Sequence, residues 1–190
     1  NITGWTYMGI YNYYSDEAII RNNKVLHKSN GYNYPYGILN YYADFVEVSG
    51  NTIVGNNAGG GGYGIYAGYC DGSSSAPVRI FNNMVTLTGS VNNTSANGLY
   101  CFSGTYNKVI FNSFYTKNAS TSTSAEVVYF YGSTGCEFKN NSVYNDGVAR
   151  VFNMTTSTTL QHDYNNYYHS GSSAVGNFTP SSNSISADPI

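Results

Sequence analysis

Residues 9–16 read GIYNYYSD, and residues 37–44 repeat this stretch as GILNYYAD, 28 positions further along the chain. Weaker copies of its first half continue through the sequence as GIYA (64–67), GLYC (98–101), VVYF (127–130) and RVFN (150–153). Internal similarity at a period of roughly 20 to 50 residues is the mark of repeat architectures, in which each copy stacks on the next. The stretch therefore predicts one domain built from stacked coils rather than a globule.

A second repeated segment follows the first in each copy. It reads IRNNKV (20–25), VSGNTI (48–53), IFNNMV (80–85), IFNSFY (110–115) and FKNNSV (138–143). Aligning these segments places one polar residue from each in a single column: Asn23, Asn51, Asn83, Ser113 and Asn141. Stacked amides can hydrogen-bond from coil to coil at a spacing of ~4.8 Å, and Asn tolerates the left-handed backbone of a corner. We therefore expect a structural asparagine ladder of Asn23, Asn51, Asn83 and Asn141.

Apolar residues alternate with period two in both segments, which is the pattern of strands. The segments between them are rich in Gly, Ser, Asn and Thr and are predicted to be long loops on one side of the molecule: 27–35, 55–62, 89–97 and 117–125. Short repeated strands without helices predict an all-β parallel β-helix, a solenoid of about six coils, over residues 1–168. Residues 169–190 are expected to be an irregular terminal segment that leads into further chain, and neither end shows a cap.

Three corner motifs carry a resemblance to a known family. Asn51-Thr52-Ile53, Asn83-Met84-Val85 and Asn141-Ser142-Val143 resemble the right-handed parallel β-helix repeats of the pectin-lyase-like superfamily. The ending DYNNYY (163–168), followed by SISADPI (184–190), is similar to the end region of such helices in large secreted bacterial proteins that use the type IX export route. These resemblances imply a right-handed β-helix and an extracellular or cell-surface location. Polysaccharide lyases of this fold use clustered acidic residues for calcium and a basic residue for proton abstraction.

Composition narrows the classes of function. Only 9% of the residues are charged and the net charge is −2, whereas Tyr and Gly each occur 21 times. The sequence has no basic stripe to neutralise phosphates, which argues against nucleic acid as a partner. No apolar run approaches the ~20 residues that a membrane-spanning helix needs. The cysteines, Cys70, Cys101 and Cys136, are expected to be small buried hydrophobes, with a Cys70–Cys101 bridge as the alternative.

The alternation also predicts which aromatic residues face outward. If Ile10, Ile38 and Ile65 point into the coil, the rings beside them form two columns on one outer face. The predicted binding face consists of Tyr11, Tyr13, Tyr41, Tyr66, Tyr100, Phe102, Tyr129, Tyr131 and Phe152. An exposed apolar patch larger than a few hundred Å² usually marks an interaction site. Three interpretations stay open: rings that only stack on each other or lie under loops, a packing surface for another chain or domain, and a platform for sugar rings.

Asp16 and Asp44 occupy the same position in the two best copies, so adjacent coils would bring their carboxylates within ~5 Å of each other. Such a pair either recruits a cation, for which calcium is the candidate, or caps the turn that follows each strand. His27, His162 and His169 fall in different coils without a Ser or Cys partner at a matched position, which argues against a nucleophilic triad. No catalytic residue is assigned, and no cofactor other than calcium is expected.

Taken together, the sequence predicts a non-catalytic extracellular module, such as a stalk, a filament unit or a surface-binding repeat. Its aromatic face would pack on other protein subunits or on polysaccharide, and the module could self-associate end to end or laterally. The alternative is a fragment of a polysaccharide lyase or another carbohydrate-active β-helix enzyme, in which Asp16 and Asp44 would be the residues to test.

Overall fold

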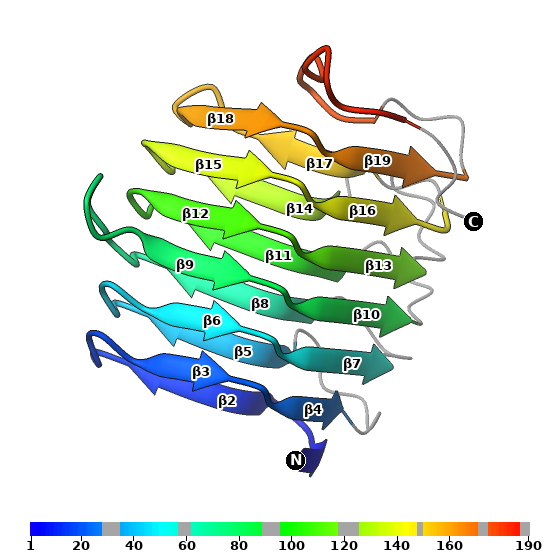
Figure 1. Cartoon of the computed structure of the whole chain (residues 1–190). Helices are drawn as coiled ribbons and strands as arrows, with labels where there is room; N and C mark the ends of the chain where they lie inside the picture. The colour runs from blue at the N-terminus through cyan, green and yellow to red at the C-terminus, as the bar shows by residue number, and fades with distance from the viewer. Residues whose placement is uncertain are drawn as a thin grey trace.

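The computed structural model describes residues 1–27, 35–56, 62–88, 96–117, 126–147, 150–170 and 175–186. Within these ranges the chain forms strands and no helix, and the strands build three parallel sheets (Figure 1). Successive strands pass from one sheet to the next, so that each sheet collects every third strand. This arrangement is consistent with a parallel β-helix, and it agrees with the all-β prediction.

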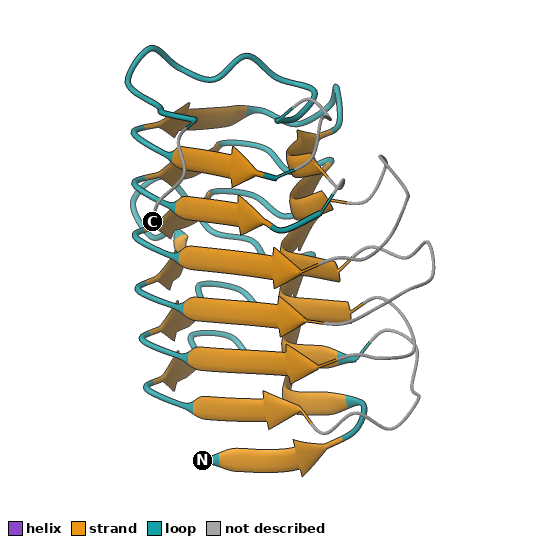
Figure 2. Cartoon of the chain, turned by 90° about the vertical axis from the view of Figure 1, so that its right-hand side faces the viewer, coloured by secondary structure: helices purple, strands orange, loops and turns teal. Residues whose placement is uncertain are grey.

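The three sheets are named A, B and C. Sheet A contains β1 (Ile2–Trp5), β4 (Lys24–His27), β7 (Thr52–Asn56), β10 (Met84–Thr88), β13 (Ser113–Lys117), β16 (Ser142–Asn145) and β19 (Asn166–His169). Sheet B contains β2 (Met8–Tyr13), β5 (Tyr36–Tyr41), β8 (Gly62–Gly68), β11 (Ala96–Phe102), β14 (Glu126–Tyr131) and β17 (Arg150–Met154). Sheet C contains β3 (Ile19–Arg21), β6 (Glu47–Ser49), β9 (Val78–Phe81), β12 (Asn107–Ile110), β15 (Cys136–Lys139) and β18 (Leu160–Asp163). Equivalent strands lie one above another along the molecule (Figure 2).

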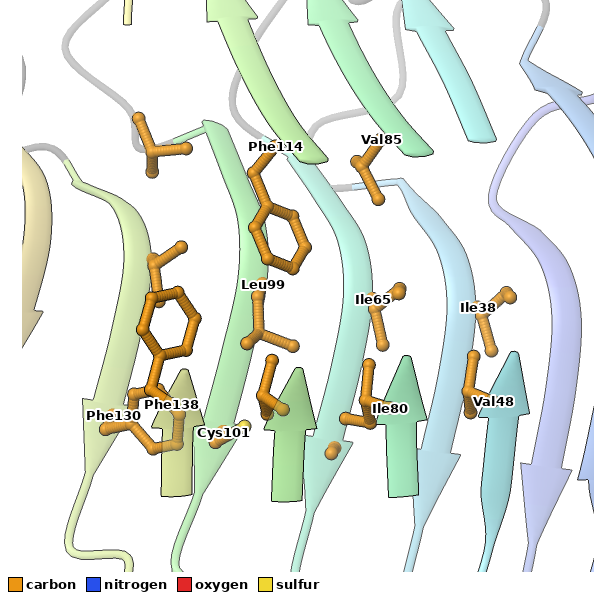
Figure 3. Close-up of a cluster of buried hydrophobic side chains, with 14 of the residues drawn as sticks. Ile38, Val48, Ile65, Ile80, Val85, Leu99, Cys101, Phe114, Phe130 and Phe138 are labelled. Atoms are coloured by element: carbon orange, nitrogen blue, oxygen red, sulfur yellow. The ribbon is translucent and has the colours of Figure 1, made fainter. Parts of the chain in front are cut away.

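Three apolar columns fill the space between the sheets. Residues in register within each sheet are buried together: Val25, Ile53, Val85, Phe114, Val143 and Tyr167 from sheet A, Ile38, Ile65, Leu99 and Val128 from sheet B, and Val48, Ile80, Val109 and Phe138 from sheet C. Figure 3 shows side chains of these columns meeting in the interior. Burying one such side chain contributes roughly 1.5–3 kcal/mol. The core therefore joins every coil to its neighbours.

Glycine is required where sheet B approaches the inward side chains of sheet A. A β-carbon at Gly37 would lie 2.6 Å from Cγ2 of Ile53 and 2.6 Å from the carbonyl oxygen of Gly64. These separations are far below a van der Waals contact of about 3.5 to 4.0 Å. At Gly98 the nearest atoms to such a β-carbon belong to the Phe114 side chain, at 3.1 Å. Sheet B therefore has less room for a side chain at Gly37 than at Gly98.

Replacing Gly37 with Ala should lower the free energy of unfolding by about 1–3 kcal/mol, because the methyl group must displace both the backbone and the Ile53 side chain. Urea denaturation followed by circular dichroism measures this change. Gly98→Ala is the matched control, and we expect its effect to be less than half as large. Equal stabilities of wild type and Gly37→Ala would contradict the close approach of the two sheets.

An asparagine ladder runs along the corner between sheets C and A. Its members are Asn23, Asn51, Asn83, Asn112, Asn141 and Asn165. Each Oδ1 from Asn51 onward accepts two hydrogen bonds of 2.9–3.2 Å, from the backbone N–H and the side-chain N–H of the preceding member. Asn51, Asn83, Asn112, Asn141 and Asn165 also donate to a backbone carbonyl of the preceding coil. The four asparagines expected from the sequence all belong to this ladder.

The ladder corrects the sequence alignment at one coil. Asn112 occupies the position expected for Ser113, which instead begins β13 and is exposed. The left-handed backbone belongs to the residue before each ladder asparagine: Asn22, Gly50, Asn82, Phe111, Asn140 and Tyr164 have φ between 53° and 63°. The alignment failed because Phe111 occupies this left-handed corner position, which bulky residues rarely adopt.

Asn112→Ala should lower the free energy of unfolding by about 3 kcal/mol or more, because it leaves several buried hydrogen-bonding groups of Asn83, Asn141 and the Ile80 carbonyl without a partner. Ser113→Ala, one residue away, should change it by less than about 0.5 kcal/mol. Chemical denaturation of both variants measures the difference. If Ser113 rather than Asn112 belonged to the ladder, Ser113→Ala would lower the free energy of unfolding more than Asn112→Ala.

Residues 175–186 lie across the end of the coils beyond β17 to β19 (Figure 1, red). The Phe178 ring lies 4.7 Å from Phe152 and 5.3 Å from Tyr167 between ring centroids. Parallel bridges join Gly176 to Phe152 and Ile185 to Asn166. The expectation that neither end is capped is therefore wrong at this end, because Phe178 covers the last aromatic residues of the core.

The register of β17 overturns one residue of the predicted aromatic face. Val128 pairs with Phe152, and Phe152 is fully buried with its ring 5.8 Å from that of Phe130. The sequence alignment had matched Val128 with Val151, which is also buried. Because Val151 and Phe152 are adjacent and both apolar, the alternation of apolar and polar residues does not distinguish the two registers. Phe152 is therefore a core residue and not part of an outer face.

The predicted loops fall mainly on residues 28–34, 57–61, 89–95 and 118–125, which lie outside the described residues. Each of these segments connects a strand of sheet A to the next strand of sheet B. Among the described residues, no helix is long and apolar enough to cross a membrane.

Candidate functional site

The outward side chains of sheet B form what we call the tyrosine face. It consists of Tyr11, Tyr13, Tyr36, Tyr41, Tyr63, Tyr66, Tyr100, Phe102, Tyr129 and Tyr131. The parallel register aligns Tyr11, Leu39, Tyr66, Tyr100 and Tyr129 in one column. A second column contains Tyr13, Tyr41, Gly68, Phe102 and Tyr131. Every aromatic residue that the sequence placed on this face lies on it, with the exception of Phe152.

The rings contact one another from β2 to β14. Centroids of Tyr36 and Tyr63 lie 4.9 Å apart in a stacked pair, and the Tyr66 ring meets Tyr63 edge to face at 5.2 Å. The chain of contacts continues through Tyr100 and Tyr129, whose centroids lie 5.2 Å apart. These distances and orientations are those of favourable aromatic pairs, each worth about 0.5–1.5 kcal/mol beyond burial. The face is therefore one connected array of rings.

Sequence reasoning missed Tyr36 and Tyr63. Each precedes the glycine at the start of a repeat, where the alternation of inward and outward residues is interrupted: Gly37 and Gly64 both direct a hypothetical β-carbon at a sheet A side chain, and the following isoleucines are also buried. A strict period of two therefore misplaces the residues before the glycine. The repeated Tyr-Gly-Ile triplet was the signal that could have identified them.

A further column, the corner stack, stands at the edge of the face where the chain leaves sheet B. Tyr14, Tyr42 and Tyr69 lie nearly parallel, with centroid separations of 5.1 and 4.7 Å and interplanar angles of 8° and 6°. All three have φ of 50°, a left-handed backbone that is uncommon for aromatic residues. The turn holds the rings in this conformation, and the corner stack extends the aromatic surface beyond the strands.

Aspartates two residues further on form a matching column. Asp16 Oδ1 accepts the backbone N–H of Asp44, Asp44 Oδ1 accepts that of Asp71, and Asp71 Oδ1 accepts that of Thr105, each at 2.9 Å. These carboxylates thus cap the turns of the adjacent coils, as one of the two interpretations of the sequence predicted. Within the described part of the chain, no three His, Cys, Asp or Glu side chains gather to hold a metal ion. Calcium at Asp16 and Asp44 stays a prediction from the sequence.

The pKa values of several hydroxyl groups on the tyrosine face are raised. Burial raises the pKa of Tyr66 and Tyr100, and in the same direction that of Tyr36, Tyr41 and Tyr129. A hydrogen bond with the Tyr14 hydroxyl is the main cause that raises the pKa of Tyr13 to about 12, with smaller contributions from burial and neighbouring phenols. These six hydroxyl groups therefore keep their protons above the pH at which a free tyrosine ionises.

These shifts predict a loss of stability in alkali. Tyrosines of the unfolded chain ionise near pH 10, whereas these phenols keep their protons to higher pH in the folded chain. Above pH 10 the folded state then binds more protons than the unfolded state, so the free energy of unfolding should fall as the pH rises from 10 through about 12.

Denaturation at a series of pH values, together with the ultraviolet absorbance of tyrosinate, measures this dependence. The double variant Tyr66→Phe, Tyr100→Phe removes two of the shifted groups and should show a shallower fall. A wild-type chain whose tyrosines all titrate near pH 10 while folded would refute the shifts.

The three cysteines belong to the interior rather than to a site. Cys70, Cys101 and Cys136 are buried and unpaired, so the alternative bridge between Cys70 and Cys101 is not formed. Burial raises the pKa of each thiol, to about 12 for Cys70. A thiol that stays protonated is a weak nucleophile, so these residues are unsuited to covalent chemistry.

Comparison of the chain with protein-family models, with curated proteins and with solved structures found no match.

Proposed function

We propose that the chain is a non-catalytic structural or adhesive module whose tyrosine face packs on a partner chain or a glycan. The observation that carries this proposal is the connected array of rings on the outside of sheet B. Tyr11 is 52% exposed and Tyr131 43% exposed, at opposite ends of the array. Large aromatic rings left in contact with water over several strands are typical of an interaction surface. Tyr is also a residue type enriched at protein interfaces, because it combines apolar area with a hydroxyl group.

Ring stacking alone accounts for part of the face. The stacked pairs stabilise sheet B whether or not anything binds to it. Sheet B does not need an aromatic ring at every position of the column, since the aliphatic Leu39 occupies one of these positions and is buried there. Several phenol rings are exposed although the stability of the sheet does not require it, which favours a binding role.

The handedness of the β-helix, the number of its coils and the location of the protein are also part of the proposal. The repeats and corner motifs support a right-handed β-helix of about six coils, of the kind found in the pectin-lyase-like superfamily. The resemblance of the ending to secreted proteins of the type IX route supports an extracellular or cell-surface location. In that setting, the module would serve as a stalk, a filament unit or a surface-binding repeat.

The enzyme alternative has weaker support. Asp16 and Asp44 each direct one carboxylate oxygen to the backbone of the next coil, which is a structural use of the group. The tyrosine face itself offers phenols that stay protonated, which are poor general bases near neutral pH. We therefore place the function in binding rather than in turnover.

The double variant Tyr100→Ala, Tyr129→Ala tests the proposal, because it removes two contacting rings from adjacent strands of the array. It should weaken self-association, or binding to a panel of polysaccharides, by about tenfold or more, the usual effect of losing important aromatic contacts. Sedimentation velocity and affinity gel electrophoresis measure the two activities.

Tyr115→Ala, Tyr144→Ala is the matched control. This pair stacks at the same centroid distance of 5.2 Å on the outer side of sheet A. Its removal should leave both activities within about twofold of the wild type, within the usual range of substitutions remote from a binding surface. Unchanged self-association and polysaccharide binding in Tyr100→Ala, Tyr129→Ala would contradict the proposal.

A further inference from the structure

Among the described residues, the tyrosine face has a hollow where the column of Tyr11, Tyr66, Tyr100 and Tyr129 lacks an aromatic ring. Leu39 stands in register between Tyr11 and Tyr66. Because the leucine side chain is shorter than a phenol, the surrounding rings border an open space of about 330 Å³ above it. The residues that line this space are Tyr11, Tyr13, Tyr36, Leu39, Tyr41 and Tyr66. Its volume lies at the lower end of the range of small-molecule sites, about 300–1,000 Å³.

The rings around the hollow hold one another in place. Tyr36 meets Tyr66 edge to face with centroids 5.5 Å apart, and Tyr41 lies 6.2 Å from Tyr66. On the opposite side, Tyr13 stacks on Tyr41 at 6.1 Å and on Tyr11 at 5.5 Å. Leu39 is 8% exposed and forms an apolar floor beneath them. The walls are therefore formed before any ligand enters, which lowers the entropy lost on binding.

The chemistry of the lining selects the ligand. None of the residues that line the hollow is Asp, Glu, Lys, Arg or His, because five of them are tyrosines and the sixth is Leu39. A carboxylate brought there would lose hydration without gaining an ionic partner, which is unfavourable. A purely aliphatic ligand would cover phenol hydroxyls without offering them hydrogen bonds. A ligand with an apolar ring surface edged by neutral hydroxyls matches both the rings and the hydroxyls of the lining, and a pyranose is such a ligand.

We propose that the hollow over Leu39 binds one ring of an uncharged hexopyranose polysaccharide, an inference that rests on the proposed binding role of the tyrosine face. The C–H surface of the sugar ring covers Leu39 and the adjacent phenol faces, while the sugar hydroxyls exchange hydrogen bonds with the tyrosine hydroxyls. The neighbouring rings of the face continue in the coil direction and offer stacking positions for the following sugar units.

The test uses the whole chain and isothermal titration calorimetry with cello-oligosaccharides, manno-oligosaccharides and oligogalacturonates. The wild type should bind at least one of the two uncharged series, and bind it about tenfold more tightly than oligogalacturonate. Leu39→Tyr fills the hollow and completes the aromatic column, so it should weaken this binding by about tenfold or more.

A second pair of variants guards against misfolding. Tyr11→Ala opens one wall of the hollow at a residue 52% exposed, and should weaken binding about threefold to tenfold. Tyr115→Ala removes a ring on the outer side of sheet A, away from the tyrosine face, and should stay within about twofold of the wild type. Circular dichroism of each variant verifies the fold.

The outcomes separate this inference from the proposed function. Wild-type affinity in Leu39→Tyr, no binding of either uncharged series, or tighter binding of oligogalacturonate would each overturn the hollow as a sugar site. If Tyr100→Ala, Tyr129→Ala still loses assembly or binding in those cases, the tyrosine face keeps its proposed function and only the hollow is excluded. If that double variant loses nothing, the proposed function fails as well.

Discussion

Parallel pairing of each coil with the next is the constraint on which the rest of the structure depends. Equivalent strands repeat at about 4.8 Å, so each side chain meets its own counterpart from the neighbouring coil. Only residue types that tolerate such self-contact can occupy a column: amides that donate and accept, aliphatic groups that pack, and rings that stack. The asparagine ladder meets this condition with hydrogen bonds of 2.9–3.2 Å between successive members. The aspartate column meets it because each Oδ1 bonds to the backbone of the next coil rather than facing another carboxylate alone.

The same constraint concentrates one chemistry on each surface. Sheet B repeats tyrosine, so its outer face is neutral, aromatic and edged with hydroxyls. Sheet C repeats charged residues instead, and Arg79 there pairs with Glu47 at 2.7 Å while Lys108 lies 3.7 Å from Glu137. A surface in such a fold is made by repetition of one residue type, and its shape changes locally where the repetition is broken. Leu39 is such a break, because it replaces a ring by a shorter side chain within a column of rings.

Prediction from the sequence was best where the copies were most alike. Residues 10–13 of β2 and 38–41 of β5 were placed correctly on the inner and outer sides, since the two stretches repeat without a gap. It failed at Ser113 and Phe152, where the neighbouring residue was an equally good match in the alignment. Hydrogen bonding by Asn112 decided the first case, and space beside Phe130 and Phe138 decided the second. Tyr36 and Tyr63 escaped because the backbone at Gly37 and Gly64 interrupts the two-residue period.

By itself, the sequence determined the strand content, the stacking of coils, most of the asparagine ladder and most of the tyrosine face, because all of these follow from short patterns that recur along the chain. Only the tertiary structure decided which of two adjacent apolar residues pairs with Val128, that Phe178 covers the end of the core, and that the rings around Leu39 border an open space. These features depend on distances between residues that are far apart in the chain or do not repeat. Periodicity carries no information about such contacts, whereas packing fixes them.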